Sequence, residues 1–265
     1  MPFGLPDDAQ RLSYGGYLHL PELLSLQRPL SDPPHHDELL FIVVHQVYEL
    51  WFKELLHELD AIVDLLEHDE ILEAVRLLRR CLEIERVLVA QVAVLETMTP
   101  GDFLAFRDRL APASGFQSWQ FRELELAAGL RDPAMLALFP EGTPERAALE
   151  RRWARPTLRE AWLAALQRRG PAGANVQERL VRVYTEPRVA YPWILLAEAL
   201  VEFDETFLLW RVRHVQMVER IIGAGRPGTG GSAGAAYLRT TLKRRTQPEL
   251  WAVRDALGAP PQAVP

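Results

Sequence analysis

The sequence predicts an all-α protein, a single helical domain built around long core helices with a pocket between them. Three observations indicate this class. Apolar residues recur at helical spacing through three long stretches, no stretch alternates apolar and polar residues as a strand does, and no internal repeat is found. The 265 residues are enough to bury a full core.

The first half of the chain contains two of the long helices. A mixed arm over residues 6–30 and a proline- and histidine-rich break at 32–35 precede the first long helix, predicted over 36–67. A turn at 68–70 leads into the second long helix, which we expect to continue to about residue 98.

Shorter helices follow. Pro100 predicts the first turn of a helix over 100–110, because proline is tolerated there, and a further helix is expected over 116–129. Between 132 and 170 the pattern weakens into short helices separated by prolines, and we expect the many arginines of this segment to form a solvated face.

The last third contains the third long helix, predicted over 193–222 after a helix at 175–186 and a break at 187–192. A glycine-rich loop at 223–234, a terminal pair of helices and a proline-rich tail complete the chain.

Composition excludes several classes of protein. A net charge of −6 argues against an electrostatic hold on nucleic acid, and Cys81, the only cysteine, excludes a disulfide framework and a thiolate metal cluster. Charges interrupt every apolar run before about 18 residues, and the first residues lack the basic and apolar parts of a secretion signal. We therefore expect a cytoplasmic protein with neither membrane nor nucleic acid as a partner.

Two isolated histidines are the strongest candidates for chemistry. His45 lies within the apolar run of the first long helix, with Phe41 one turn before it and Glu49 one turn after it. His214 lies on an apolar face of the third long helix, between Trp210 and Met217. A neutral imidazole backed by aromatic and thioether groups suits an axial ligand of haem iron, although two hydrogen-bonded core histidines would show the same spacing.

Two further histidines and one arginine have alternative explanations. His35 and His36 are adjacent at a predicted helix start, so a helix cap explains them better than a metal does. Arg107 follows Phe103 and Phe106, and a guanidinium beside aromatic rings is suited to gripping a carboxylate; a surface ion pair is the alternative.

The chain resembles one family, the tryptophan 2,3-dioxygenases, over nearly its whole length. The matching stretches are YGGYLHL (14–20), HDELLFIVVHQVYELWFKELLHELD (36–60), VLETMTPGDFLAFRDRLAPASGFQSWQFRELE (94–125), WRVRHVQMVERIIG (210–223) and GTGGSAGAAYLR (228–239).

The resemblance implies a haem-dependent dioxygenase that inserts O2 across the indole C2–C3 bond of L-tryptophan and yields N-formyl-L-kynurenine, the first step of the kynurenine pathway of tryptophan catabolism. It also implies a homotetramer in which residues 1–265 form one domain with a b-type haem, ferrous in the active state. The N-terminal arm, 1–30, would contact a neighbouring subunit.

The resemblance also implies roles for particular residues. His214 would be the proximal iron ligand and metal-binding residue, with Trp210 against the haem and Ser114 near its edge. His45 would be the distal histidine that hydrogen-bonds the indole N–H, and Phe41 would pack on the indole.

For the rest of the substrate, the resemblance implies that Arg107 binds the carboxylate and Thr229 contacts the ammonium and carboxylate. Phe103 stands where some members carry tyrosine, so a hydroxyl contact would be absent. The residues of the arm that would complete the neighbouring subunit's pocket are Tyr14, Tyr17 and Leu18.

The chain departs from the family pattern in two places, and three other interpretations fit part of its sequence. The arginine-rich middle is shorter than in many members, and the glycine-rich loop gains a residue within 223–227. A haem sensor or carrier would need His214 but not Arg107 together with Thr229. An indoleamine-type oxygenase would accept broader indoles, and a purely structural helical bundle would bind no chromophore.

Overall fold

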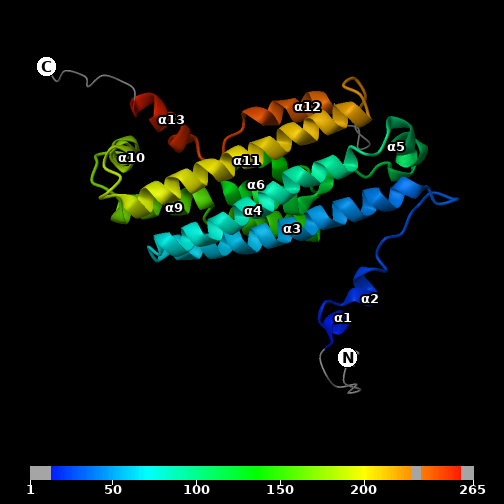
Figure 1. Ribbon diagram of the computed structural model, residues 1–265, viewed down its shortest axis with the longest axis horizontal. Helices are drawn as coiled ribbons and strands as arrows, with labels where there is room; N and C mark the ends of the chain where they lie inside the picture. The colour runs from blue at the N-terminus through cyan, green and yellow to red at the C-terminus, as the bar shows by residue number, and fades with distance from the viewer. Residues whose placement is uncertain (1–12, 228–233, 258–265) are drawn as a thin grey trace, which may run out of the picture.

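The computed structural model describes residues 13–227 and 234–257, and within these ranges every regular element is a helix (Figure 1). The all-α prediction is confirmed. The elements are α1 (Tyr14–Tyr17), α2 (Leu20–Leu23), α3 (His36–Glu67), α4 (Ile71–Leu95), α5 (Pro100–Arg107), η1 (Asp108–Leu110), η2 (Gly115–Gln117), α6 (Trp119–Ala128), α7 (Pro133–Leu136), α8 (Pro144–Trp153), α9 (Leu158–Arg169), α10 (Val176–Thr185), α11 (Tyr191–Ile221), α12 (Ala235–Thr240), η3 (Thr241–Lys243) and α13 (Pro248–Leu257).

The three long helices form the centre of the molecule, with α4 packed between α3 and α11 (Figure 1). Each helix turns an apolar face inward, and Leu55, Leu78 and Phe203, one from each helix, are completely buried. One continuous hydrophobic core extends from these helices to α6, α9 and α13. The apolar periodicity of the sequence therefore identified the main packing faces correctly.

Local capping decides where the shorter helices begin. Thr99 and Asp102 form a capping box that starts α5, with Pro100 in the first turn. The helix predicted over 116–129 begins later, at Trp119, because Ser118 is extended and its side chain accepts a hydrogen bond from the Phe121 amide. His35 caps α3 by accepting from the Asp37 amide, as expected.

The N-terminal arm stands away from the bundle (Figure 1). Its base is attached by Glu38, a buried residue of α3 whose carboxylate accepts hydrogen bonds from the Leu30 amide (2.6 Å) and the Ser31 amide (3.0 Å). Beyond that base the arm exposes Tyr14 and Tyr17, which are 77% and 68% accessible. The arm therefore contributes little to the core of its own chain.

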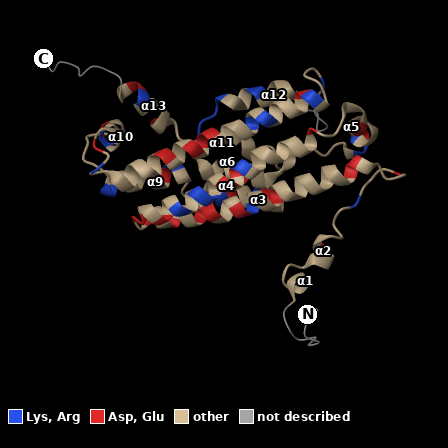
Figure 2. Cartoon of the chain, viewed as in Figure 1, with Lys and Arg blue, Asp and Glu red and all other residues tan. Residues whose placement is uncertain are grey.

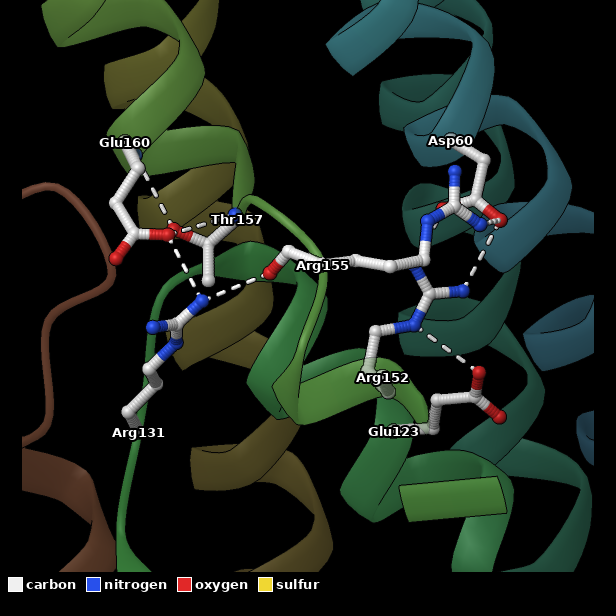
Figure 3. Close-up of polar contacts among 7 residues, drawn as sticks. All are labelled: Asp60, Glu123, Arg131, Arg152, Arg155, Thr157 and Glu160. Atoms are coloured by element: carbon white, nitrogen blue, oxygen red, sulfur yellow. Dashed lines mark hydrogen bonds and ion pairs between the residues drawn. The ribbon is translucent and has the colours of Figure 1, made fainter. Parts of the chain in front are cut away.

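The prediction of a solvated arginine face was wrong for part of the 132–170 segment. Arg152 is buried, and its Nε atom donates to Glu123 (3.0 Å) while its Nη2 atom donates to Asp60 (3.1 Å) (Figure 3). Arg155 also reaches Asp60, at 2.8 Å. These pairs fasten α8 to α3 and α6, because α8 packs on α6 and thereby brings its arginines over acidic side chains.

Two hollows of about 420 and 390 Å³ flank Arg155 on this side of the molecule. Neither is lined by His45 or His214. Taken singly, none of the helices in the described ranges is long and apolar enough to cross a membrane; α4 and the stretch 100–110 meet that test only together, across a 90° bend.

Candidate functional site

The candidate site lies at the end of the bundle where α5 packs against both α3 and α11. This packing brings together residues that are far apart in the sequence. His45 comes from α3, Arg107 from the end of α5, and His214 from α11. The two imidazoles are close enough that His45 contributes to the lowered pKa of His214.

His45 is held in one tautomer by its own helix. Its Nδ1 atom lies 2.7 Å from the carbonyl oxygen of Phe41, and a carbonyl can only accept, so Nδ1 carries the proton. His45 keeps an exposed face, yet the protein atoms around it lower its pKa by desolvation, which the hydrogen bond to the Phe41 carbonyl and the charge of Glu49 oppose only in part. The ring is therefore neutral at pH 7, and its Nε2 atom is free to accept a hydrogen bond.

An aromatic wall adjoins His45. The Phe41 ring lies 4.1 Å from the imidazole, and the rings of Phe103 and Phe106 each lie 5.7 Å from that of Phe41. Both α5 phenylalanines are buried, so they support Phe41 from behind. The arrangement offers an apolar surface to a planar aromatic ligand.

Arg107 has one hydrogen-bond donor in use and another without a partner. Its Nη2 atom donates to the carbonyl oxygen of Pro227 at 2.6 Å, whereas its Nε atom is buried and has no partner among the described residues. Leaving such a donor unpaired costs about 1–3 kcal/mol. A carboxylate placed against the guanidinium would satisfy it.

His214 is the most unusual side chain of the site. Burial lowers its pKa to about 4, with smaller contributions from His45 and Arg122. The residue nevertheless keeps some accessible surface, and in the described part of the chain neither ring nitrogen has a hydrogen-bond partner. A neutral imidazole among protein atoms, open on one side and with an unused lone pair, fits the requirements of an axial iron ligand.

Trp210 supports the His214 ring from one helical turn below. The two rings are nearly parallel, at 11°, with centroids 5.5 Å apart. Trp210 itself packs against Phe121 (5.0 Å) and Tyr48 (6.1 Å). The imidazole therefore packs on an aromatic ring that is itself held by other aromatic rings, which suits a metal ligand that must keep a fixed orientation.

Not every predicted site residue is brought to this end of the bundle. Ser114 caps η2, and its position at a haem edge stays a prediction. Tyr14, Tyr17 and Leu18 are exposed on the N-terminal arm, which projects from the bundle in Figure 1. Thr229 lies outside the described residues.

Sequence reasoning missed a buried ion cluster beside the site. Arg122 and Glu125 of α6 and Arg211 of α11 are all buried, and Glu125 pairs with both arginines. The available signal was the placement of charges on apolar helix faces, with Arg122 and Glu125 three residues apart.

The chain matches the family described as tryptophan 2,3-dioxygenase over residues 6–137 and 144–257. It is 51% identical to the tryptophan 2,3-dioxygenase of Nocardioides sp. strain JS614 over 260 residues, covering 95% of this chain and 97% of that protein. It is 50% identical to that of Anaeromyxobacter sp. strain K, covering 93% and 96% of the two chains. The enzyme of Herpetosiphon aurantiacus is 48% identical, with coverage of 94% and 100%.

Proposed function

Because the chain belongs to the tryptophan 2,3-dioxygenase family, we propose that His214 holds the iron of a b-type haem and that Phe41, His45 and Arg107 bind L-tryptophan beside it. The family assignment makes the protein a haem-dependent oxidoreductase. It inserts O2 across the indole C2–C3 bond of L-tryptophan to give N-formyl-L-kynurenine, the first step of tryptophan degradation.

The observation that carries the site assignment is the state of His214. His214 is a neutral ring that stacks on Trp210, keeps part of its surface accessible and has no hydrogen-bond partner among the described residues, so its lone pair is available to a ligand. Iron in the ferrous state would use it, and the haem would supply the binding and activation of O2. The protein supplies the pocket, the charge and the orientation.

The substrate's two ends are assigned to different residues. The unpaired Nε–H of Arg107 is the donor for the carboxylate, and Thr229 is proposed as a second contact for the carboxylate and ammonium. Phe41 packs against the indole, and His45 accepts the indole N–H at Nε2 while its Nδ1–H remains on the Phe41 carbonyl. Phe103 adds bulk but no hydroxyl. Orientation of this kind contributes about 7–11 kcal/mol toward a bimolecular step.

In this scheme His45 orients the substrate and is not required to remove a proton. Its lowered pKa keeps Nε2 available as an acceptor at neutral pH. The indole N–H would be unable to donate to a protonated imidazole, so acid should weaken substrate binding.

The same proposal includes the assembly. Between residues 13 and 30 the arm presents exposed tyrosine and leucine side chains, and Glu22 and Arg28 are its only acidic or basic residues besides His19, so this part is almost uniformly tan in Figure 2. Apolar side chains of α3, Leu39 and Leu50, are also exposed. We propose a cytoplasmic homotetramer of single-domain subunits in which Tyr14, Tyr17 and Leu18 complete a neighbour's pocket and Ser114 lies near the haem edge.

The test compares His214→Ala with the unaltered protein after expression with excess haem. The variant should lose the iron–histidine visible spectrum and the conversion of L-tryptophan into N-formyl-L-kynurenine, identified by mass. An unchanged spectrum would show that another residue holds the iron. Haem loading is measured first, so that an underloaded sample is not read as an inactive one.

A further inference from the structure

Arg122 and Glu125 of α6 and Arg211 of α11 form a buried ion triad, and Arg211 lies three residues before the proposed iron ligand. The Glu125 carboxylate accepts from Arg122 Nη1 at 2.6 Å and from Arg211 Nη2 at 2.7 Å. The three side chains are 7%, 1% and 3% exposed, respectively. Ion pairs this deeply buried contribute little net stability, because desolvation of the charges offsets their attraction.

A series of side-chain contacts leads from the triad to the aromatic ring on which His214 stacks. Arg211 lies three residues before His214 on α11, so the two side chains are neighbours on one helix face. Arg122 lies over the Phe121 ring at 5.2 Å, and Phe121 packs 5.0 Å from Trp210, on which His214 stacks. The charge of Arg122 also contributes to the lowered pKa of His214.

The triad carries an excess positive charge. Two guanidinium groups face one carboxylate, and the Nε atoms of Arg122 and Arg211 are buried without a partner among the described residues. Burial raises the pKa of Glu85 of α4, a buried acid whose charge is coupled to that of Arg211, well above its usual value, which favours the uncharged form. Asp204, further along α11, is engaged by the Thr246 amide and hydroxyl and by the Trp251 indole N–H.

We propose that the net positive charge of the Arg122–Glu125–Arg211 triad raises the Fe(III)/Fe(II) midpoint potential of iron held on His214. The higher potential keeps the iron in the ferrous, O2-binding state. This inference rests on the proposed function, since it takes His214 as the iron ligand. The step concerned is the gain of one electron by ferric iron from a small-molecule one-electron reductant, with no bond made or broken in the protein.

The physical reason is the sign of the charge. Reduction lowers the positive charge at the iron by one, and a nearby buried cation makes that change more favourable. At an effective dielectric constant of about 20, a unit charge about 10 Å away changes a one-electron equilibrium roughly tenfold. A tenfold change corresponds to a midpoint shift of about 59 mV. Burial matters because an exposed charge would be screened by salt.

The experiment is a spectroelectrochemical titration of the haem-loaded protein and its variants. Arg122→Met should lower the midpoint potential by about 59 mV, which corresponds to a tenfold change in the one-electron equilibrium. Glu125→Gln removes the negative charge of the triad and should raise the midpoint potential. Arg86→Met is the matched control, because it removes the same charge from an exposed pair with Glu202 between α4 and α11. Its potential should remain close to that of the unaltered protein.

Opposite shifts distinguish an electrostatic role from a structural one, because a loosened proximal side would move both variants in the same direction. Shifts of equal sign, or shifts no larger than that of Arg86→Met, would overturn the inference. If a single variant fails to fold, the triple replacement Arg122→Met, Glu125→Met and Arg211→Met removes the net charge without leaving an unpaired ion and should lower the potential. Absence of an iron–histidine spectrum in the unaltered protein would instead refute the proposed function.

Discussion

Replacing Arg107 with methionine tests the assignment of the substrate's carboxylate. The structure gives this guanidinium two tasks, since Nη2 donates to the Pro227 carbonyl while Nε has no partner among the described residues. If Nε is reserved for the carboxylate, the variant should lose catalytic efficiency with L-tryptophan. Tryptamine, which lacks the carboxylate, should be affected far less.

The magnitude follows from the one free donor. A hydrogen bond from a charged group contributes about 1.5–3 kcal/mol. Since about 1.4 kcal/mol is a factor of ten, kcat/KM for L-tryptophan should fall roughly 10- to 150-fold in Arg107→Met. The unaltered enzyme should discriminate against tryptamine by at least that factor, and the variant should have lost most of the discrimination.

The assay measures kcat/KM for both substrates in the unaltered enzyme, in Arg107→Met and in Arg109→Met. Arg109 is an exposed neighbour in η1 and serves as the charge-matched control, with little expected change. An equal loss for both substrates in Arg107→Met would refute the carboxylate assignment. It would indicate that the arginine acts by tethering the chain at Pro227.

Three further predictions address the histidines and the core. His45→Ala should keep the iron–histidine spectrum and lose only part of the activity with L-tryptophan, and loss of haem to the extent seen in His214→Ala would contradict the separate roles. In the haem-free protein, the free energy of unfolding should decrease as the pH falls from about 6.5 towards 4. Burial lowers the pKa of His214 to about 4, so in this pH range the unfolded chain binds a proton that the folded chain does not. Urea titrations should show a smaller decrease for His214→Gln, and an identical decrease in both proteins would count against a neutral His214 ring in the folded state. Leu78→Ala should reduce the free energy of unfolding by about 2–5 kcal/mol, because the side chain is fully buried on the central helix, whereas Leu72→Ala, at a 57% exposed position of the same helix, should change it little.

The sequence by itself determined the helical class, the three long helices and the two isolated histidines. Apolar periodicity is a local property, so the inward faces of α3, α4 and α11 could be identified without knowing their partners. The same reasoning marked His45 and His214, because a single ionisable ring interrupts an apolar face in each case. Pro100 also predicted the start of α5, because proline is tolerated in the first turn of a helix.

Only the tertiary structure decided which charges are buried and which donors are left unpaired. Arg152 was expected in solvent and is instead enclosed with Asp60 and Glu123, which lie 92 and 29 residues away along the chain. The positive triad beside His214 and the unpaired Nε of Arg107 depend in the same way on contacts between helices. Helical periodicity specifies the face on which a side chain lies, but its burial and its partners depend on which helix covers that face, and that is settled by packing across the whole chain.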